Sequence, residues 1–305
     1  MRGLGQAASA ASENAVALGY VSGWRVVRLL PEPTARRMFA RLGHELYRRN
    51  GRGVQRLRSN VARVCADVGG ADPDRLTREA VQSYMRYWCE LFRLPAWPVD
   101  DLVRRTRTIN EGLLREAYAR GNGVVIALPH MANWDWAGAW ACATGMPLST
   151  VAERLKPERL YDEFAAYRES LGMEILPLGS DDTFGRLVAR VRSGGLVCLL
   201  ADRDLSRSGV EVDLCGEPAK MPRGPAVLAR VTGAPLIPAT LAYVGDDMEI
   251  TFSAEVPHVP GASGQTAMMQ GVADAFSRGF RAHPQDWHMM QKVFVADLPV
   301  DTVWG

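Results

Sequence analysis

The residues with the clearest chemical potential lie in the segment HMANWD, where Asp135 comes five residues after His130. A proline and the apolar run Val124–Leu128 directly precede His130. A histidine bonded to a carboxylate can act as a base, because its second ring nitrogen stays free to take a proton. In one continuous helix the two side chains would point roughly 140° apart. They can meet only if His130 lies in a loop and a helix begins just after it.

Asn133 supplies a start for such a helix, because asparagine is a favoured N-cap residue. Asp135 would then lie in the first turn, where its carboxylate can fold back and accept a hydrogen bond from the imidazole. The alternative is that Asp135 complements the helix dipole and His130 is a polar loop residue. The spacing of the two residues fits both interpretations.

Other chemistries have weaker support in the sequence. The chain has neither a G-x-S-x-G nucleophile motif nor a G-x-x-x-x-G-K-[ST] phosphate loop. The glycines of GNGVVI precede a strand, whereas a dinucleotide loop would follow one. His283 and His288 have no partners at zinc-ligand spacing, so we expect no metal site. A His–Asp pair without a protein nucleophile suits direct transfer, in which a deprotonated hydroxyl attacks a bound ester or thioester.

Composition narrows the classes of partner. The 305 residues are 47% apolar with a net charge of +2, enough for one large α/β domain. Residues 25–63 contain eleven arginines but only Glu32 and Glu45 as acids, which favours an anionic membrane surface as partner. A solvated helix face is the alternative. Few aromatics accompany these arginines, so nucleic acid is not expected.

The sequence also indicates how the protein can contact a membrane and whether its cysteines form disulfides. No apolar run approaches the roughly 18 residues that span a bilayer, and the N-terminus lacks the apolar centre of a signal peptide. Any membrane contact is therefore predicted to be peripheral. The five cysteines are scattered along the chain, as expected for reduced thiols.

The periodicity of apolar residues predicts two regions within one domain. Residues 1–120 are predicted to form a helical, membrane-facing region, interrupted by the PEP segment at Pro31–Pro33, with Thr77 capping one helix. Residues 121–305 are predicted to form the α/β body. Strands are expected at 124–128, 148–152, 174–176, 196–201, 235–244 and 248–254, with helices at 133–144, 160–171, 181–191, 223–231 and 264–281 and an edge strand at 210–214. This alternation predicts a mixed, largely parallel sheet covered by helices on both faces.

Functional residues of such sheets gather beyond the carboxyl ends of the strands. His130 follows the strand at 124–128, and the polar run ADRDLSRSG follows the strand at 196–201. Both are therefore expected to face one cleft.

Four sequence blocks resemble a known superfamily. HMANWD resembles the H-x4-D/E motif of the glycerophospholipid-type acyltransferases. VAERLKPERLYDEFAAYRESLGMEILPLG and GGLVCLLADRDLSRSGVEVDLCGEPAKMPRGPAVLARVTGAPLIPA resemble further blocks of the branch that acylates lipid A, in the family order. The lack of a spanning helix and the closing segment QDWHMMQKVF are more similar to the phosphatidylinositol mannoside acyltransferases of actinobacteria. The resemblance covers residues 121–295.

The resemblance implies an activity. This is the transfer of a fatty acyl chain, typically palmitoyl, from acyl-CoA to the 6-hydroxyl of the mannose attached to inositol O2. The implied partners are acyl-CoA, a glycolipid acceptor and the cytoplasmic face of the plasma membrane, with peripheral attachment, no resident cofactor and no metal. A lysophospholipid or lipid A-type acceptor is the alternative acyltransferase interpretation, and a peripheral lipid-binding protein is the non-enzymatic one.

The resemblance also assigns residues by position. His130 becomes the base and Asp135 its motif carboxylate, while Asp204 in ADRDL matches an acidic residue that could also orient the ring. We expect both carboxylates to flank His130, and Arg168 to lie near one of them. A buried ion pair between core elements is the alternative for Arg168 and Asp204. Substrate binding is expected of Arg168, Glu153, Arg154, His288 and Asn133.

Overall fold

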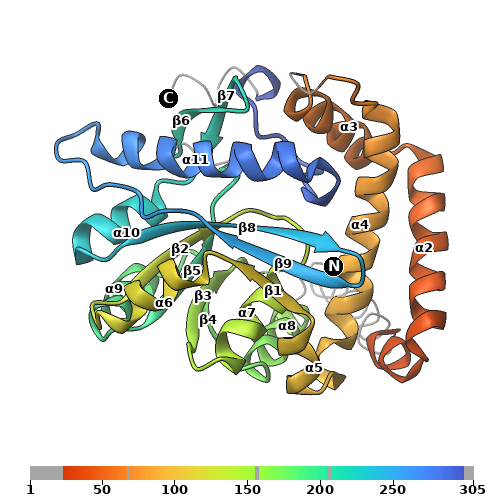
Figure 1. The fold of residues 1–305 in the computed structure, drawn as a ribbon, viewed down its shortest axis with the longest axis horizontal. Helices are drawn as coiled ribbons and strands as arrows, with labels where there is room; N and C mark the ends of the chain where they lie inside the picture. Colours follow the sequence, from red (N-terminus) through yellow and green to blue (C-terminus); the bar gives the residue numbers. More distant parts are fainter. Residues whose placement is uncertain (1–22, 67–68, 155–157, 205–207, 299–305) are drawn as a thin grey trace, which may run out of the picture.

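The computed structural model describes residues 23–66, 69–154, 158–204 and 208–298. At its centre lies a seven-stranded sheet in the order β1-β9-β8-β2-β5-β3-β4 (Figure 1). The parallel strands of this sheet are β8 (Leu236–Val244), β2 (Val124–Leu128), β5 (Leu196–Leu200), β3 (Leu148–Ala152) and β4 (Glu174–Pro177). β9 (Asp247–Phe252) runs antiparallel to β8, and β1 (Thr106–Ile109) pairs parallel with β9. The predicted mixed, largely parallel sheet is confirmed.

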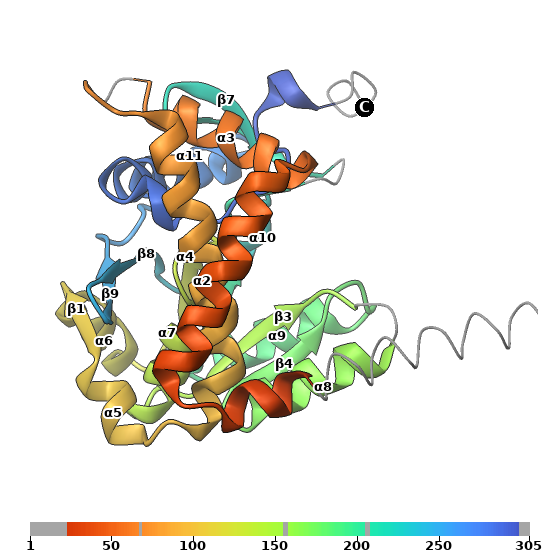
Figure 2. The same cartoon turned by 90° about the vertical axis from the view of Figure 1, so that its right-hand side faces the viewer.

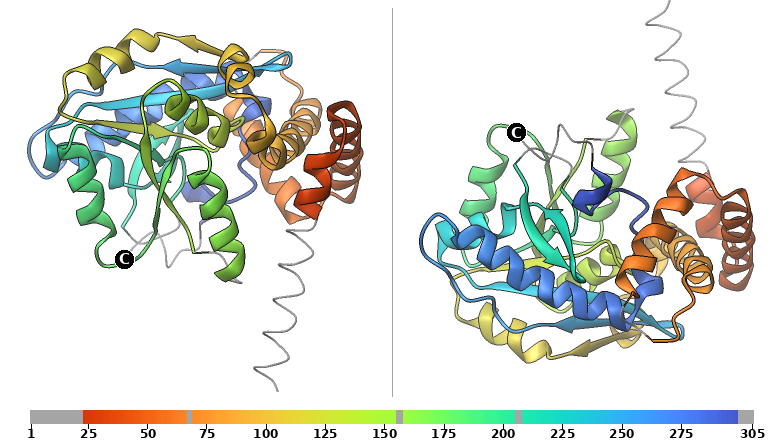
Figure 3. Two further views of the ribbon diagram at one scale, coloured as in Figure 1. Left: turned by 90° about the horizontal axis from the view of Figure 1, so that it is seen from below. Right: turned by 90° about the horizontal axis from the view of Figure 1, so that it is seen from above.

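Helices cover the sheet on both sides. Helix α11 (Gly264–Ala282) lies in front of the sheet when the protein is seen from above, and α7 (Trp134–Ala143) lies in front when it is seen from below (Figure 3). β2 is buried along its whole length, as a central strand covered on both faces must be. Helix α6 (Glu111–Ala119) lies on the same side of the sheet as α7 (Figure 1). The remaining crossover helices are α8 (Glu158–Glu169), α9 (Thr183–Arg192) and α10 (Gly224–Thr232).

The first third of the chain forms a helical layer beside the sheet. Its helices are α2 (Glu32–Arg49), α3 (Arg52–Val64), α4 (Pro73–Arg93) and α5 (Val99–Arg104), and α2 lies along α4 (Figure 2). This region is not purely helical as predicted, because β1 belongs to it and joins the sheet through β9. The predicted cap at Thr77 is also wrong. α4 begins earlier, because the Asp72 carboxylate accepts hydrogen bonds from the backbone of Asp74 and Arg75.

A small hairpin lies outside the main sheet. β6 (Val210–Leu214), predicted as an edge strand, pairs instead with β7 (Glu217–Met221), which the sequence pattern did not reveal. The hairpin packs against α11, since the Cys215 backbone N–H donates to the Ser277 hydroxyl.

The expected membrane-facing surface is only partly described. Residues 1–22 of the region predicted to face the membrane lie outside the described residues. Trp24, on the helical segment 23–29, is turned inward: it is 5% exposed, and its indole N–H donates to the Phe92 carbonyl oxygen at 2.9 Å. Among the described residues, no helix is both long enough and apolar enough to cross a bilayer.

The C-terminal segment folds back over the loop that carries His130. The backbone N–H of His288 donates to the His130 carbonyl at 2.9 Å, and the N–H of Ala132 donates to the Asp286 carbonyl at 2.8 Å. Asn60 of α3, which is fully buried, ties this segment to the helical layer. Its amide nitrogen donates to the carbonyl oxygens of Met289 and Gln291, at 2.8 and 2.9 Å.

We predict that Asn60→Ala lowers the free energy of unfolding by about 1–3 kcal/mol, because the carbonyls of Met289 and Gln291 lose the buried donor that holds them. Urea titration measures the change, and hydrogen exchange should accelerate in residues 287–294. Gln55→Ala, an exposed change on the same helix, is the matched control. If both variants unfold at the same urea concentration as the unaltered chain, Asn60 does not hold this segment.

Candidate active site

His130 lies in the loop between β2 and α7, held by the carboxylate of Asp202. Its Nδ1 lies 2.7 Å from Asp202 Oδ1, and its backbone N–H donates to Oδ2 at 3.0 Å. The indole N–H of Trp287 also donates to Oδ2, at 2.8 Å. Because an ionised carboxylate only accepts, Nδ1 carries the proton and Nε2 keeps its lone pair. Nε2 has no hydrogen bond to any residue that the structure describes.

The environment of Asp202 favours its ionised form. Burial of the fully enclosed side chain would by itself raise the pKa of Asp202. Electrostatic attraction to His130 and the hydrogen bonds from His130 and Trp287 outweigh burial and bring this pKa below its usual value. An ionised Asp202 would stabilise the imidazolium that forms when Nε2 takes a proton.

Asp135 and Asp204 were predicted to flank the His130 ring, but the carboxylate that holds this ring is that of Asp202. Strand register explains the difference: Leu128 of β2 pairs with Leu200 of β5, so the residues two positions further along, His130 and Asp202, lie opposite each other. The backbone N–H of Asp204 donates to the Lys220 carbonyl at 3.1 Å, at the edge of the hairpin. The predicted strand 196–201 runs one residue past the observed end at Leu200, and counting two residues from its predicted end gives Arg203, so only the observed register identifies Asp202.

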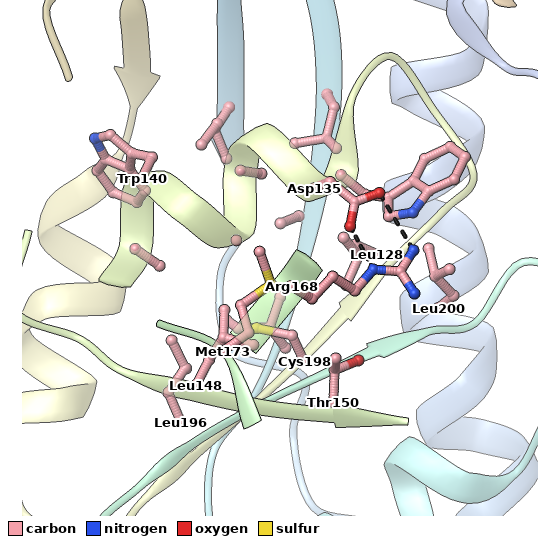
Figure 4. Close-up of a pocket in the computed structure, with 18 of the residues that line it drawn as sticks. Leu128, Asp135, Trp140, Leu148, Thr150, Arg168, Met173, Leu196, Cys198 and Leu200 are labelled. Atoms are coloured by element: carbon pink, nitrogen blue, oxygen red, sulfur yellow. Dashed lines mark hydrogen bonds and ion pairs between the residues drawn. The ribbon is translucent and has the colours of Figure 1, made fainter. Parts of the chain in front are cut away.

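Asp135 forms a buried ion pair with Arg168. Arg168 Nε lies 2.5 Å from Asp135 Oδ1 (Figure 4). The Tyr87 hydroxyl donates to Asp135 Oδ2 at 3.1 Å. The expected closeness of Arg168 to one of the carboxylates is therefore confirmed. Burial would lower the pKa of Arg168, but Asp135 raises it, so the guanidinium stays charged. The Trp134 ring contacts both networks: it stacks on Tyr87 with ring centroids 4.1 Å apart, and it lies edge-on to His130 with ring centroids 5.3 Å apart.

Asn133 caps α7, as predicted. Its side-chain oxygen accepts from the Trp136 backbone N–H at 2.9 Å, and its amide nitrogen donates to Glu90 at 3.2 Å. Asn133 is fully buried and lines neither of the cavities beside His130, so its contacts position the helix. Arg154 is exposed and pairs with Glu158 at 3.2 Å.

Two cavities meet at His130. The first has a volume of about 280 Å³ and lies between the sheet and α7. Its walls are mostly apolar (Figure 4) and include Ile126, Leu128, Leu196, Cys198 and Leu200 from alternate positions of β2 and β5. Alternation arises because successive side chains of a strand point to opposite faces.

The second cavity, of about 370 Å³, is walled by aromatic and polar side chains. The aromatic residues are Tyr84, Tyr87, Trp88, Trp134, Tyr161 and Phe164. Polar groups come from Arg203, His288 and Gln291, none of which lines the first cavity. Both cavities are lined by His130, Trp134, Ala152, Glu153 and Arg168.

His288 lies beside His130 in the wall of the second cavity. It is 6% exposed, and its Nε2 lies 2.8 Å from the Ser83 hydroxyl. Burial, followed by the nearby His130, lowers the pKa of His288 to about 3. The ring is therefore neutral at physiological pH, with one nitrogen that can donate a hydrogen bond and one that can accept.

No three His, Cys, Asp or Glu side chains in the described ranges are grouped as ligands of a metal ion would be. All five cysteines are free thiols.

Comparison with known proteins shows the family of the chain. The sequence model of the bacterial lipid A biosynthesis acyltransferases matches residues 7–295. The chain belongs to this acyltransferase family. It is 45% identical to the phosphatidylinositol mannoside acyltransferase of Mycolicibacterium smegmatis, over 92% of this chain and 92% of that protein. It is 44% identical to the protein of the same name from Mycobacterium tuberculosis H37Rv, over 95% and 92%. The resemblance noted in the sequence blocks is confirmed.

We predict that the buried, neutral His288 makes the protein acid-sensitive. Unfolded chains protonate this ring below its usual pKa of 6.5, whereas the folded protein does so only near pH 3, so stability falls as the pH drops through this window. Between pH 7 and 5 the ring should account for roughly 2 kcal/mol of lost unfolding free energy. Urea titrations at both pH values should show a smaller loss for His288→Gln. His44→Gln, at an exposed position, should keep the full loss; equal losses in all three proteins would contradict the prediction.

Proposed function

We propose that the protein transfers a fatty acyl chain from acyl-CoA to phosphatidylinositol mannosides, at the 6-hydroxyl of the mannose linked to inositol O2. The observation that carries the proposal is the position of His130, where an apolar cavity meets an aromatic and polar one. The apolar cavity suits an acyl chain, and the other suits a sugar, whose ring faces stack on aromatic side chains. The names of the mycobacterial relatives support the acceptor.

In the proposed reaction, His130 Nε2 removes the proton of the acceptor hydroxyl as its oxygen attacks the thioester carbonyl. Asp202 holds Nδ1–H and stabilises the imidazolium. The tetrahedral intermediate collapses by breaking the C–S bond, and the imidazolium returns its proton to the departing thiolate. The products are the acylated glycolipid and free CoA, with no acyl group on the protein.

Arg168, Glu153 and His288 are the proposed contacts for the acceptor, because all three line the second cavity. Asp135 acts through Arg168, whose guanidinium it fixes from within the core. Removing Asp135 would leave a buried charge unpaired, which is costly. The carboxylate of the H-x4-D motif therefore serves as a positioning group in this proposal.

The proposed site of action is the cytoplasmic face of the plasma membrane, with peripheral attachment through residues 25–63. Several arginines of this segment are paired internally, such as Arg63 with Glu217 and Asp297. Arg25, Arg41 and Arg52 are exposed and remain available for anionic lipid.

We predict that His130→Ala and Asp202→Asn each lower kcat by roughly 10²–10⁴, because the first removes the base and the second no longer stabilises the imidazolium. CoA release from palmitoyl-CoA, with phosphatidylinositol dimannoside as acceptor, measures the rate. Asp204→Asn is the matched control and should lose far less than Asp202→Asn. If the wild-type protein acylates only lysophospholipids, the proposed acceptor is wrong. If His130→Ala keeps full activity, His130 is not the base.

We also predict salt-sensitive binding to acidic vesicles. Each basic residue near the lipid surface contributes about 1 kcal/mol, and salt screens it. Replacing Arg25, Arg41 and Arg52 by Gln should weaken co-sedimentation with phosphatidylinositol-containing vesicles. Replacing Arg104, Arg107 and Arg120 makes the same charge change elsewhere and should weaken it less. Equal binding to neutral phosphatidylcholine vesicles would contradict electrostatic attachment.

A further inference from the structure

The apolar cavity has a defined direction, set by the register of three parallel strands. Leu128 pairs with Leu200 at the end nearest His130. The next level inward contains Cys198 of β5 with its paired residues on β2 and β3. The deepest level, or rung, contains Leu196 paired with Leu148. Figure 4 shows this succession from Leu200 through Cys198 to Leu196. From the first rung to the last the cavity runs roughly 13 Å, at about 3.3 Å per residue.

Helix α7 closes the cavity from the other side. It starts beside His130 at Trp134, and its cavity-facing residues are small near the middle of the helix, where Ala137, Gly138 and Ala141 line the space. Gly138 lies over the deepest rung: a Cβ placed there would be 3.6 Å from the nearest side-chain carbon of Leu148. The absence of a side chain thus lets neighbouring side chains approach the helix backbone closely at the end of the cavity remote from His130.

Met173 lies at the same depth. It directly precedes β4, which pairs with β3 next to Leu148. Its sulfur would lie 2.8 Å, and its terminal methyl 3.0 Å, from a Cβ on Gly138. The distance to the sulfur is shorter than real contacts allow, so even one methyl group at position 138 must displace the end of Met173. A methionine side chain is flexible enough to move, which makes such a variant compatible with folding.

We propose that Gly138 and Met173 together set the length of acyl chain that the protein accepts. This inference rests on the proposed function, since it assigns the acyl chain to the first cavity with its thioester at His130. A long chain must reach the space beneath Gly138, whereas a short chain ends at an earlier rung. Bulk at position 138 therefore penalises long chains selectively, and truncation of Met173 enlarges the deep end.

The decisive comparison uses Gly138→Ala and Gly138→Val with octanoyl-, dodecanoyl-, palmitoyl- and stearoyl-CoA. Binding is measured by calorimetry without acceptor, and transfer is measured with phosphatidylinositol dimannoside. Both variants should weaken palmitoyl-CoA binding by roughly tenfold or more, the effect of a methylene-sized misfit in an apolar pocket, and leave octanoyl-CoA nearly unchanged. Gly185→Ala is the matched control, because a Cβ on this helical glycine meets nothing within 4 Å.

A second variant guards against a general structural effect. Met173→Ala should favour stearoyl-CoA relative to palmitoyl-CoA, and Gly138→Ala combined with Met173→Ala should recover palmitoyl-CoA binding. Equal losses at every chain length, or no loss for the long chains, would overturn the inference; the second result would direct the chain toward Trp140 instead. If binding follows the predicted pattern but no mannoside is acylated, the proposed function fails while the length assignment stands.

Discussion

The in-register pairing of β2 with β5 is the constraint on which the site depends. Both strands are apolar and end at the same level, so their first polar successors are held face to face at 2.7 Å. The same register stacks the inward side chains of the strands into the wall of the apolar cavity. A one-residue slip would turn every one of these side chains to the other face of the sheet and separate His130 from Asp202. One structural fact thus fixes both the proposed base and the direction of the proposed acyl chain.

The buried charges of the site are each held by a specific partner. Two carboxylates lie buried within the site, and each has its own partner: Asp202 holds a histidine, whereas Asp135 holds the Arg168 guanidinium. Buried charges are costly unless they are paired and hydrogen-bonded, and both carboxylates meet this condition through further donors, Trp287 and Tyr87. The H-x4-D spacing therefore places two residues in neighbouring networks and does not join them directly.

The sequence predicted the parts of the fold that local pattern determines. The boundaries of β2 and β3 and the Asn133 cap follow from apolar runs and capping chemistry, and the structure confirms them. β1 was missed because TRTI is short and mostly polar, and it becomes a strand only through pairing with β9. Asp202 was missed because choosing between two aspartates of ADRD requires strand register. Half of the aromatic wall of the second cavity, Tyr84, Tyr87 and Trp88, comes from α4, far from the motifs in sequence, so no spacing could have revealed this half.

The central claim is that the acyl chain lies beneath α7 with its thioester at His130. The most direct test is photo-crosslinking with a palmitoyl-CoA that carries a diazirine at the end of its chain, followed by peptide mapping. The account predicts labelling in the peptides that contain Gly138, Leu148 and Met173, and competition by unlabelled palmitoyl-CoA. Labelling confined to the aromatic residues of α4, such as Tyr84 and Trp88, would place the chain in the second cavity and contradict the account.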